Sequence, residues 1–362
     1  MNDDNGKISV RQVLILCIIM YCSPIVRYLP LMCVGFAKQA AWLAPLIAGV
    51  VEALYMLAWC EFLKTYDKKS YIEVVKDILG KIIGNILAVI YFVWFVLVTA
   101  YNLRLYGERL IATTMPHVDI LLILLSMLIV IGYVMKSGIV PFGRMNEVFF
   151  YILSALFIGY CILAIPEMKF KYLFPITYKD AVPVLKASIP VLTIFSYNIM
   201  IFMFNDKIDH RGEFKPVVMQ KVIILTISSM LSIIVPLAIF SAPILVKMPL
   251  PFMYAMMQVS IFDIFERLEA GIIMFWIVTD FVLLFVFIYS ALHMIRISFN
   301  LPNVRPLRVI YIMGIFLLSL ILAKSTLELE TLSRYILTYL NVILGFGVPI
   351  IVFFVGKIRK KI

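Results

Sequence analysis

The sequence predicts an all-α integral membrane protein with ten transmembrane helices. Of its 362 residues, 64% are hydrophobic and only 15% are charged, and the mean hydropathy is +1.04. Soluble globular proteins contain roughly 45–50% apolar residues. The apolar residues of this chain also gather in stretches of about 20, the length that a helix needs to cross a bilayer. These observations exclude a soluble enzyme.

Ten such stretches follow one another along the chain. They cover approximately 12–35, 41–63, 83–107, 119–136, 147–165, 187–204, 217–240, 268–295, 307–323 and 335–356. No low-complexity linker separates them, so we expect residues 1–362 to form a single transmembrane domain. The segment 241–267 is apolar but is interrupted by Pro243, Pro249 and Pro251. It predicts an interfacial helix or lid over a cavity on the outer side, or else a plain surface loop.

The positive charges predict the orientation of the chain. An even number of helices places both ends on the same side of the membrane. With the N-terminus inside, 20 of the 32 Lys and Arg lie on the inner side and 11 on the outer side, while Arg27 lies within a helix. Because cytoplasmic loops carry the excess of Lys and Arg, we expect both termini in the cytoplasm. This distribution also explains the net charge of +11 without nucleic-acid binding.

Two of the predicted helices contain helix-breaking sequences. Cys22-Ser23-Pro24 lies near the middle of the first helix and Pro30 follows, while Ser196-Tyr197-Asn198 lies in the middle of the sixth. A break at this depth is tolerated where protein or a water-filled cavity satisfies the backbone, although a simple proline kink is the alternative in the first helix. Broken first and sixth helices predict a five-plus-five inverted repeat around a central site. The helix N-termini at a break carry partial positive charge and suit a carboxylate, whereas the freed carbonyl groups suit an ammonium. A zwitterion such as an amino acid fits both.

Four charged residues stand out within the predicted helices: Arg27, Glu52 and Asp280, and Glu269 nearer a helix end. A charge in this position costs at least about 2.5 kcal/mol, so it indicates either function or pairing. Arg27 is the best ligand-binding candidate, because it follows the break and a guanidinium can hold a carboxylate through two hydrogen bonds. The alternative is a salt bridge from Arg27 to Glu52 or Asp280.

The third helix carries a polar and aromatic stripe. Tyr91, Phe95, Val98 and Asn102 recur at the spacing of one helix face, which is typical of core packing and alternatively lines a small pocket. Thr279, beside Asp280, offers a hydroxyl for an ion or a substrate. The three His and five Cys form no CxxC or HExxH motif and no close pair, and no nucleophile–base set is visible. We therefore expect no enzyme activity, no cofactor and no metal site.

Several motifs together resemble a known family over nearly the whole chain. They are Ile8-Ser9 with Gln12, Leu29-Pro30, the run Ala40-Ala41-Trp42-Leu43-Ala44-Pro45, and the run Glu266-Arg267-Leu268-Glu269-Ala270 followed by Trp276 and Asp280. This pattern resembles the endospore germination permeases, which are the B subunits of GerA-type spore germinant receptors in the amino acid/polyamine/organocation superfamily. Family members often have small residues with glycines at the first-helix break, where this chain has Ser23-Pro24-Ile25-Val26-Arg27.

The resemblance implies a LeuT-like fold that binds a small germinant, often an amino acid, in the inner membrane of the dormant spore. It also implies two partners, a membrane-embedded A subunit and a lipoprotein C subunit. Carried over by position, the pocket between helices 1, 3, 6 and 8 would contain Cys22, Ser23, Ile25, Arg27, Tyr91, Phe95, Val98, Phe195, Ser196, Tyr197, Asn198, Thr279 and Asp280. The alternative function is an ion-coupled amino acid or amine transporter of the same fold, with Asp280 or Glu52 as its proton carrier.

Overall fold

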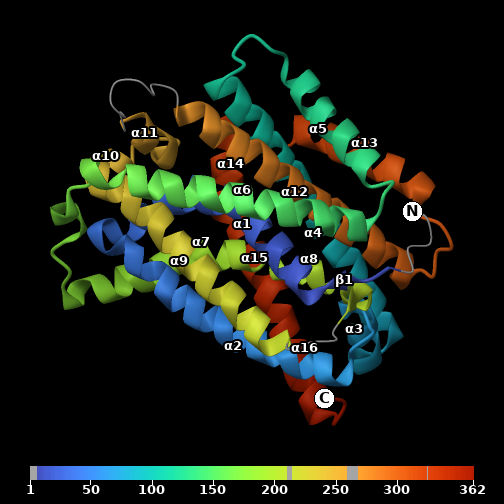
Figure 1. Cartoon of the computed structure of the whole chain (residues 1–362). Coiled ribbons are helices and arrows are strands. Elements are labelled where there is room, and N and C mark those ends of the chain that lie inside the picture. The colour runs from blue at the N-terminus through green and yellow to red at the C-terminus, as the bar shows by residue number, and fades with distance from the viewer. Residues whose placement is uncertain (1–5, 210–213, 259–267, 324) are drawn as a thin grey trace.

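The computed structural model describes residues 6–209, 214–258, 268–323 and 325–362. The described chain is almost entirely helical (Figure 1). Seven helical segments in it are long and apolar enough to cross a membrane: Val10–Thr65, Lys81–Thr113, Ile139–Glu167, Tyr178–Phe202, Phe214–Phe240, Ala270–Ser298 and Thr326–Ile358. The first is a joined piece of 56 residues, and two shorter apolar helices cover Ile120–Val134 and Pro306–Ile321. Each of the ten predicted stretches therefore coincides with helix, and the chain is an integral membrane protein.

The N-terminal helix α1 (Val10–Ala37) lies at the centre of the fold. Ser9 caps it, because its hydroxyl accepts from the backbone N–H of Gln12 while the Gln12 side chain accepts from the Ser9 N–H. The predicted break in this helix is wrong, since α1 continues through both Pro24 and Pro30. Each proline removes one backbone donor, which a helix buried among α7, α9 and α12 tolerates.

After α1 the chain turns through η1 (Lys38–Leu43) into α2 (Ala44–Thr65) and then α3 (Tyr71–Leu79). The helices α4 (Lys81–Thr113), α5 (Ile120–Val134) and α6 (Ile139–Leu163) follow. Gly80 and Gly138 precede α4 and α6 with φ angles of 95° and 87°, a conformation that favours glycine. Asp119 caps α5 through the N–H of Leu121.

The sixth predicted helix is interrupted where the sequence predicts. The short turns η2 (Ile165–Glu167), η3 (Phe170–Leu173) and η4 (Tyr178–Asp180) lead into α7 (Ala181–Phe195). Ser196 and Tyr197 form a turn before α8 (Asn198–Phe202). Then η5 (Asn205–Lys207) leads to β2 (Ile208–Asp209), which pairs in parallel with β1 (Ile8–Ser9).

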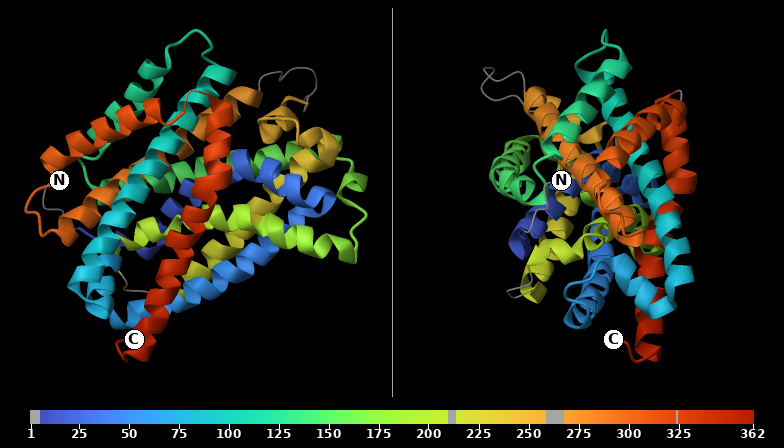
Figure 2. Two further views of the ribbon diagram at one scale, coloured as in Figure 1. Left: turned by 180° about the vertical axis from the view of Figure 1, so that it is seen from behind. Right: turned by 90° about the vertical axis from the view of Figure 1, so that its right-hand side faces the viewer.

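The second half begins with α9 (Phe214–Phe240), which packs along α1 and α2. The described part of the segment 241–267 forms two short helices, α10 (Ala242–Leu245) and α11 (Pro251–Met257). They are followed by α12 (Leu268–Ser298) and α13 (Arg305–Ile321). The last helical run is α14 (Thr326–Leu332), the π-helical turn η6 (Ser333–Leu337), α15 (Thr338–Val342), the π-helical turn η7 (Ile343–Gly347) and α16 (Val348–Ile358). This run extends along the whole molecule (Figure 2).

The outer surface of the bundle is apolar. Leu54 on α2, Ile82 on α4 and Ile321 on α13 are each more than 60% exposed, and many other large apolar side chains face outward. A surface of this kind fits the hydrocarbon of a bilayer, because soluble proteins rarely expose apolar patches of such extent. Inside, the rings of Trp59 and Phe202 stack with centroids 3.6 Å apart, which ties α2 to α8.

Candidate functional site

A cavity of about 300 Å³ opens between α1, α4, α11 and the start of the last helical run. Its size lies at the lower end of the range for small-molecule sites, roughly 300–1,000 Å³. The lining residues are Arg27, Tyr28, Leu31, Met32, Tyr101, Leu105, Glu108, Arg109, Ala112, Thr113, Pro249, Leu250, Met253, Tyr254, Met257, Thr326, Glu330, Ser333 and Arg334. The wall combines apolar and aromatic side chains with five charged ones: Arg27, Glu108, Arg109, Glu330 and Arg334.

Two cations in this cavity, Arg27 and Arg334, make no ion pair with a described carboxylate, and Arg334 is exposed. Arg27 is the partly buried one. Within the described residues it makes no ion pair and no side-chain hydrogen bond. The predicted salt bridge from Arg27 to Glu52 or Asp280 is therefore wrong in this structure. Each of those carboxylates is engaged by another cation, and a partly buried guanidinium is left facing the cavity.

Asp280 pairs with Arg109, a residue that lies beyond the end of the predicted stretch 83–107. The Arg109 guanidinium donates to the Asp280 carboxylate and, at 3.3 Å, to the hydroxyl of Ser23. It also lies over the ring of Trp276, with 4.6 Å from Cζ to the centroid, a cation–π contact. Because α4 extends to Thr113, Arg109 reaches α12 and α1 from the wall of the cavity.

Glu52 belongs to a separate buried polar cluster, defined here as Tyr21, Glu52, Asn198 and Lys221. The Lys221 ammonium donates to Glu52 Oε1 at 2.9 Å and to Asn198 Oδ1 at 2.7 Å. The Asn198 amide donates to Glu52 Oε1 at 2.5 Å, and Tyr21 donates to Asn198 Oδ1 at 2.6 Å. The side chains of Lys221 and Glu52 are 5% and 0% exposed. One amide at the α7–α8 interruption thus joins α1, α2 and α9.

The other predicted pocket residues lie apart from one another. Cys22 and Ile25 line a second, apolar cavity of about 110 Å³ between α1, α6 and α9. Seven residues are fully or nearly fully buried and line none of the cavities described here: Tyr91, Phe95, Val98, Phe195, Ser196, Tyr197 and Thr279. The hydroxyl of Tyr91 donates to the carbonyl of Leu344, and that of Thr279 to the carbonyl of Phe275. The side chain of Glu269 lies outside the described part of the structure.

Arg109 and Lys221 are site residues that the hydropathy pattern does not indicate. The apolar stretch 83–107 ends before Arg109, and Lys221 lies near the start of the stretch 217–240. The available signal was the pair of carboxylates at mid-helix, since each needs a cation when it is buried. In the structure that cation is Arg109 on α4 for Asp280 and Lys221 on α9 for Glu52.

Together the fold and the cavity define an all-helical, membrane-spanning protein with a small internal site that carries an unpaired cation. The chain matches the model of the family described as "Spore germination protein" over residues 7–328, and it belongs to that family. It is 20% identical over 367 residues to spore germination protein KB of Bacillus subtilis, covering 99% of this chain and 96% of that protein. It is also 21% identical over 252 residues to spore germination protein YndE of Bacillus subtilis, covering 69% of each.

Proposed function

We propose that this protein is the B subunit of a spore germinant receptor and that it binds a small nutrient bearing a carboxylate, such as an amino acid, in the cavity beside Arg27. The observation that carries the proposal is the position of Arg27: a guanidinium without a described anionic partner lines a cavity of about 300 Å³. A bidentate pair with a carboxylate would satisfy it. Glu108 and Glu330 line the same cavity and would favour the ammonium of a zwitterion.

Membership of the spore germination family supports a sensing role rather than a chemical step. A ligand that binds one conformation better than another shifts the equilibrium between them, and nothing further is needed for a signal. The receptor would pass that shift to an A subunit in the membrane and a lipoprotein C subunit. It would reside in the inner membrane of the spore, with both termini in the cytoplasm.

Within this proposal the chain forms one ten-helix transmembrane domain with a LeuT-like inverted repeat. Two features support it: the ten predicted stretches are helical, and the sixth is interrupted at Ser196–Tyr197. The other predicted pocket residues, which lie where helices 1, 3, 6 and 8 cross, remain proposed ligand contacts. Of these residues, Ser23 and Asp280 hold Arg109 at the wall of the cavity.

The test is ligand-induced stabilisation of the purified chain, alone and together with its A and C subunits, across the single amino acids. A ligand that binds only the folded state adds about 2.7 kcal/mol at 100 times its Kd. We expect one or a few amino acids to raise Tm and the variant Arg27→Met to abolish the rise while its own Tm stays close to that of the parent. Arg308→Met, which removes a cation of α13 outside the cavity, is the matched control.

Two results would count against the proposal. If Arg27→Met keeps the same ligand response, the carboxylate is bound elsewhere. If the folded complex shows no shift with any amino acid, the subunit is a scaffold or conduit rather than the binding subunit.

A second candidate function is ion-coupled transport of an amino acid or amine. One observation favours it: Glu52 is fully buried, and its Oε2 has no hydrogen-bond partner among the described residues, as expected of a group that gains and loses a proton. A transporter acts alone. Proteoliposomes that contain this chain without partners would therefore take up the amino acid when an imposed proton gradient drives protons inward. Glu52→Gln would stop that uptake, whereas a receptor subunit would show none to begin with.

A further inference from the structure

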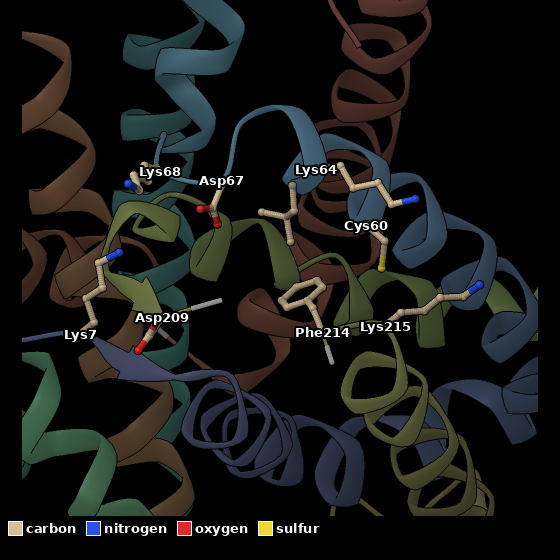
Figure 3. Close-up of a pocket in the computed structure, with 9 residues that line it drawn as sticks. Lys7, Cys60, Lys64, Asp67, Lys68, Asp209, Phe214 and Lys215 are labelled. Atoms are coloured by element: carbon tan, nitrogen blue, oxygen red, sulfur yellow. The ribbon is translucent and has the colours of Figure 1, made fainter. Parts of the chain in front are cut away.

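A second large cavity lies at the opposite end of α1 from the Arg27 site. This basic groove has a volume of about 580 Å³ and is formed by the end of α2, the turn after it, Lys7 before β1, Asp209 of β2, and the start of α9. Figure 3 shows the side chains around it. Its lining is Lys7, Cys60, Leu63, Lys64, Asp67, Lys68, Asp209, Phe214 and Lys215.

Four lysines, Lys7, Lys64, Lys68 and Lys215, line this groove together with Asp67 and Asp209. Lys7 and Lys68 lie with the two aspartates at one end of it, and Lys64 and Lys215 lie at the other end (Figure 3). Within the described residues, none of the four lysines makes an ion pair or a side-chain hydrogen bond. Their charges therefore add to a positive potential over the groove. Such a concentration of free cations predicts an anionic occupant.

The groove is held in shape by contacts between segments that are distant in sequence. The parallel pairing of Ile8 with Ile208 brings the N-terminal segment and Lys7 to the groove. The side-chain amide of Asn205 donates to the carbonyl of Lys69 at 3.2 Å, which fixes the turn that carries Asp67 and Lys68. The backbone segments that carry Lys7 and Lys68 are thus held beside the groove before any ligand arrives.

The position of the groove along the helices indicates where its ligand comes from. Lys64 lies in the last turn of α2 and Lys215 in the first turn of α9, where two span-length apolar helices end. Along the same helices Leu54, Ile223 and Ile227 are 51–64% exposed and present an apolar surface. The groove therefore lies at the level of lipid headgroups, above a surface that acyl chains can cover. Basic pockets between membrane helices are known binding places for anionic headgroups.

We propose that the basic groove binds the phosphate headgroup of an anionic phospholipid, with its acyl chains lying along α2 and α9. The lysines attract the phosphate and hydrogen-bond to the neighbouring headgroup oxygens, and Phe214 and Leu63 border the glycerol region. This site is separate from the Arg27 cavity, so it does not depend on the proposed function.

Cys60 provides a reporter inside the groove. Its thiol lies between Lys64 and Lys215 and beside Phe214 (Figure 3), and the residue is partly exposed. A headgroup in the groove blocks access to this sulfur. Cys17, Cys33 and Cys161 are buried and serve as internal controls for unfolding.

The experiment follows alkylation of Cys60 by iodoacetamide in the full-length chain in nonionic detergent, by peptide mass spectrometry. Dioleoylphosphatidylglycerol is titrated against dioleoylphosphatidylcholine and inorganic phosphate. We expect phosphatidylglycerol to slow alkylation at least fivefold and the other two additions to leave it unchanged. One lysine near an anionic membrane contributes about 1 kcal/mol, so each Lys→Gln change should raise the half-protecting lipid concentration about fivefold.

The charge variant is K7Q/K64Q/K68Q/K215Q, and the matched control is K169Q/K171Q/K179Q/K186Q, which removes four exposed lysines far from the groove. The first should lose protection and the second keep it. Three results would overturn the proposal. They are no protection of the parent chain by phosphatidylglycerol, equal protection by inorganic phosphate, and protection by a poly-glutamate peptide but not by lipid. The last would assign the groove to an acidic protein segment instead.

Discussion

Removing the charge of Lys221 should destabilise the protein strongly, and removing its partner as well should restore much of the loss. In Lys221→Met the ammonium disappears together with two charge-assisted hydrogen bonds, to Glu52 at 2.9 Å and Asn198 at 2.7 Å. At about 1.5–3 kcal/mol each, these bonds are together worth about 3–6 kcal/mol. A loss of about 3–5 kcal/mol is typical for breaking a buried ion pair, and here the remaining carboxylate is 0% exposed and loses its counter-charge.

The double variant Glu52→Gln/Lys221→Met removes both charges and should therefore lie within about 1–2 kcal/mol of the parent. The measurement is reversible unfolding of the purified chain in mixed detergent micelles, read by circular dichroism and arranged as a double-mutant cycle. Lys357→Met is the control, because the Lys357–Glu61 pair is equally short at 2.8 Å but both side chains are 48% exposed. That change should cost less than about 1 kcal/mol. A single-variant loss below about 1 kcal/mol at Lys221, or a double-variant loss equal to the sum, would refute the reasoning.

Three further changes have defined outcomes. Gly345→Ala would place a Cβ against the Ser196 Cβ and 2.7 Å from its carbonyl oxygen, so it should cost about 1–3 kcal/mol in unfolding free energy. Val98→Phe overpacks a fully buried site, so it should lower stability by a similar amount, measured by the same unfolding assay. The Tyr66 hydroxyl donates to the Asp77 carboxylate at 2.6 Å, and this hydrogen bond lowers the pKa of Asp77 in the folded state. The bond therefore stabilises the fold above about pH 4, and this stabilisation is lost as the pH falls through the folded pKa. Tyr66→Phe should make Tm less dependent on pH in the acid range.

Each of these three changes has a control in the same chain. At Gly314 no atom lies within 4 Å of the place that an alanine methyl would take, so Gly314→Ala should be neutral or stabilising by about 0.5–1 kcal/mol. Val93 on the same helix as Val98 is 51% exposed, and Val93→Phe should be tolerated. Tyr178 is 86% exposed, so Tyr178→Phe should leave the pH dependence unchanged. If a control variant changes the unfolding free energy, or the pH dependence of Tm, as much as the variant it is paired with, the named contact is not the cause.

Hydropathy alone predicted the helices, because a bilayer demands long apolar segments whatever the tertiary structure. It also located the interruption at Ser196, where polar residues lie between apolar ones. The break in α1 was wrong because a proline removes one hydrogen bond, and a helix packed on all sides keeps its path without it. Local sequence therefore marks a weak point in a helix but does not decide whether the helix breaks there.

The candidate site was predictable only in part. Arg27, Glu52 and Asp280 stand out because charges are rare inside helices, but their pairing depends on which faces meet after folding. Lys221 reaches Glu52 over 169 positions and Arg109 reaches Asp280 over 171, and no local pattern reports such distances along the chain. The aromatic stripe of Tyr91, Phe95 and Val98 has the spacing of a pocket and of a core alike; the structure buries all three.

The contact between Arg109 and Trp276 gives the molecule a built-in optical signal. Trp276 is one of four tryptophans, is 1% exposed, and has a guanidinium 4.6 Å from its ring centroid. Indole emission responds to the electric field at the ring, and Arg109 lies in the wall of the cavity that Arg27 lines. A carboxylate entering that cavity changes this field without touching the indole. Occupancy can thus be followed by intrinsic fluorescence, in the unlabelled chain, and the response should vanish in Trp276→Phe.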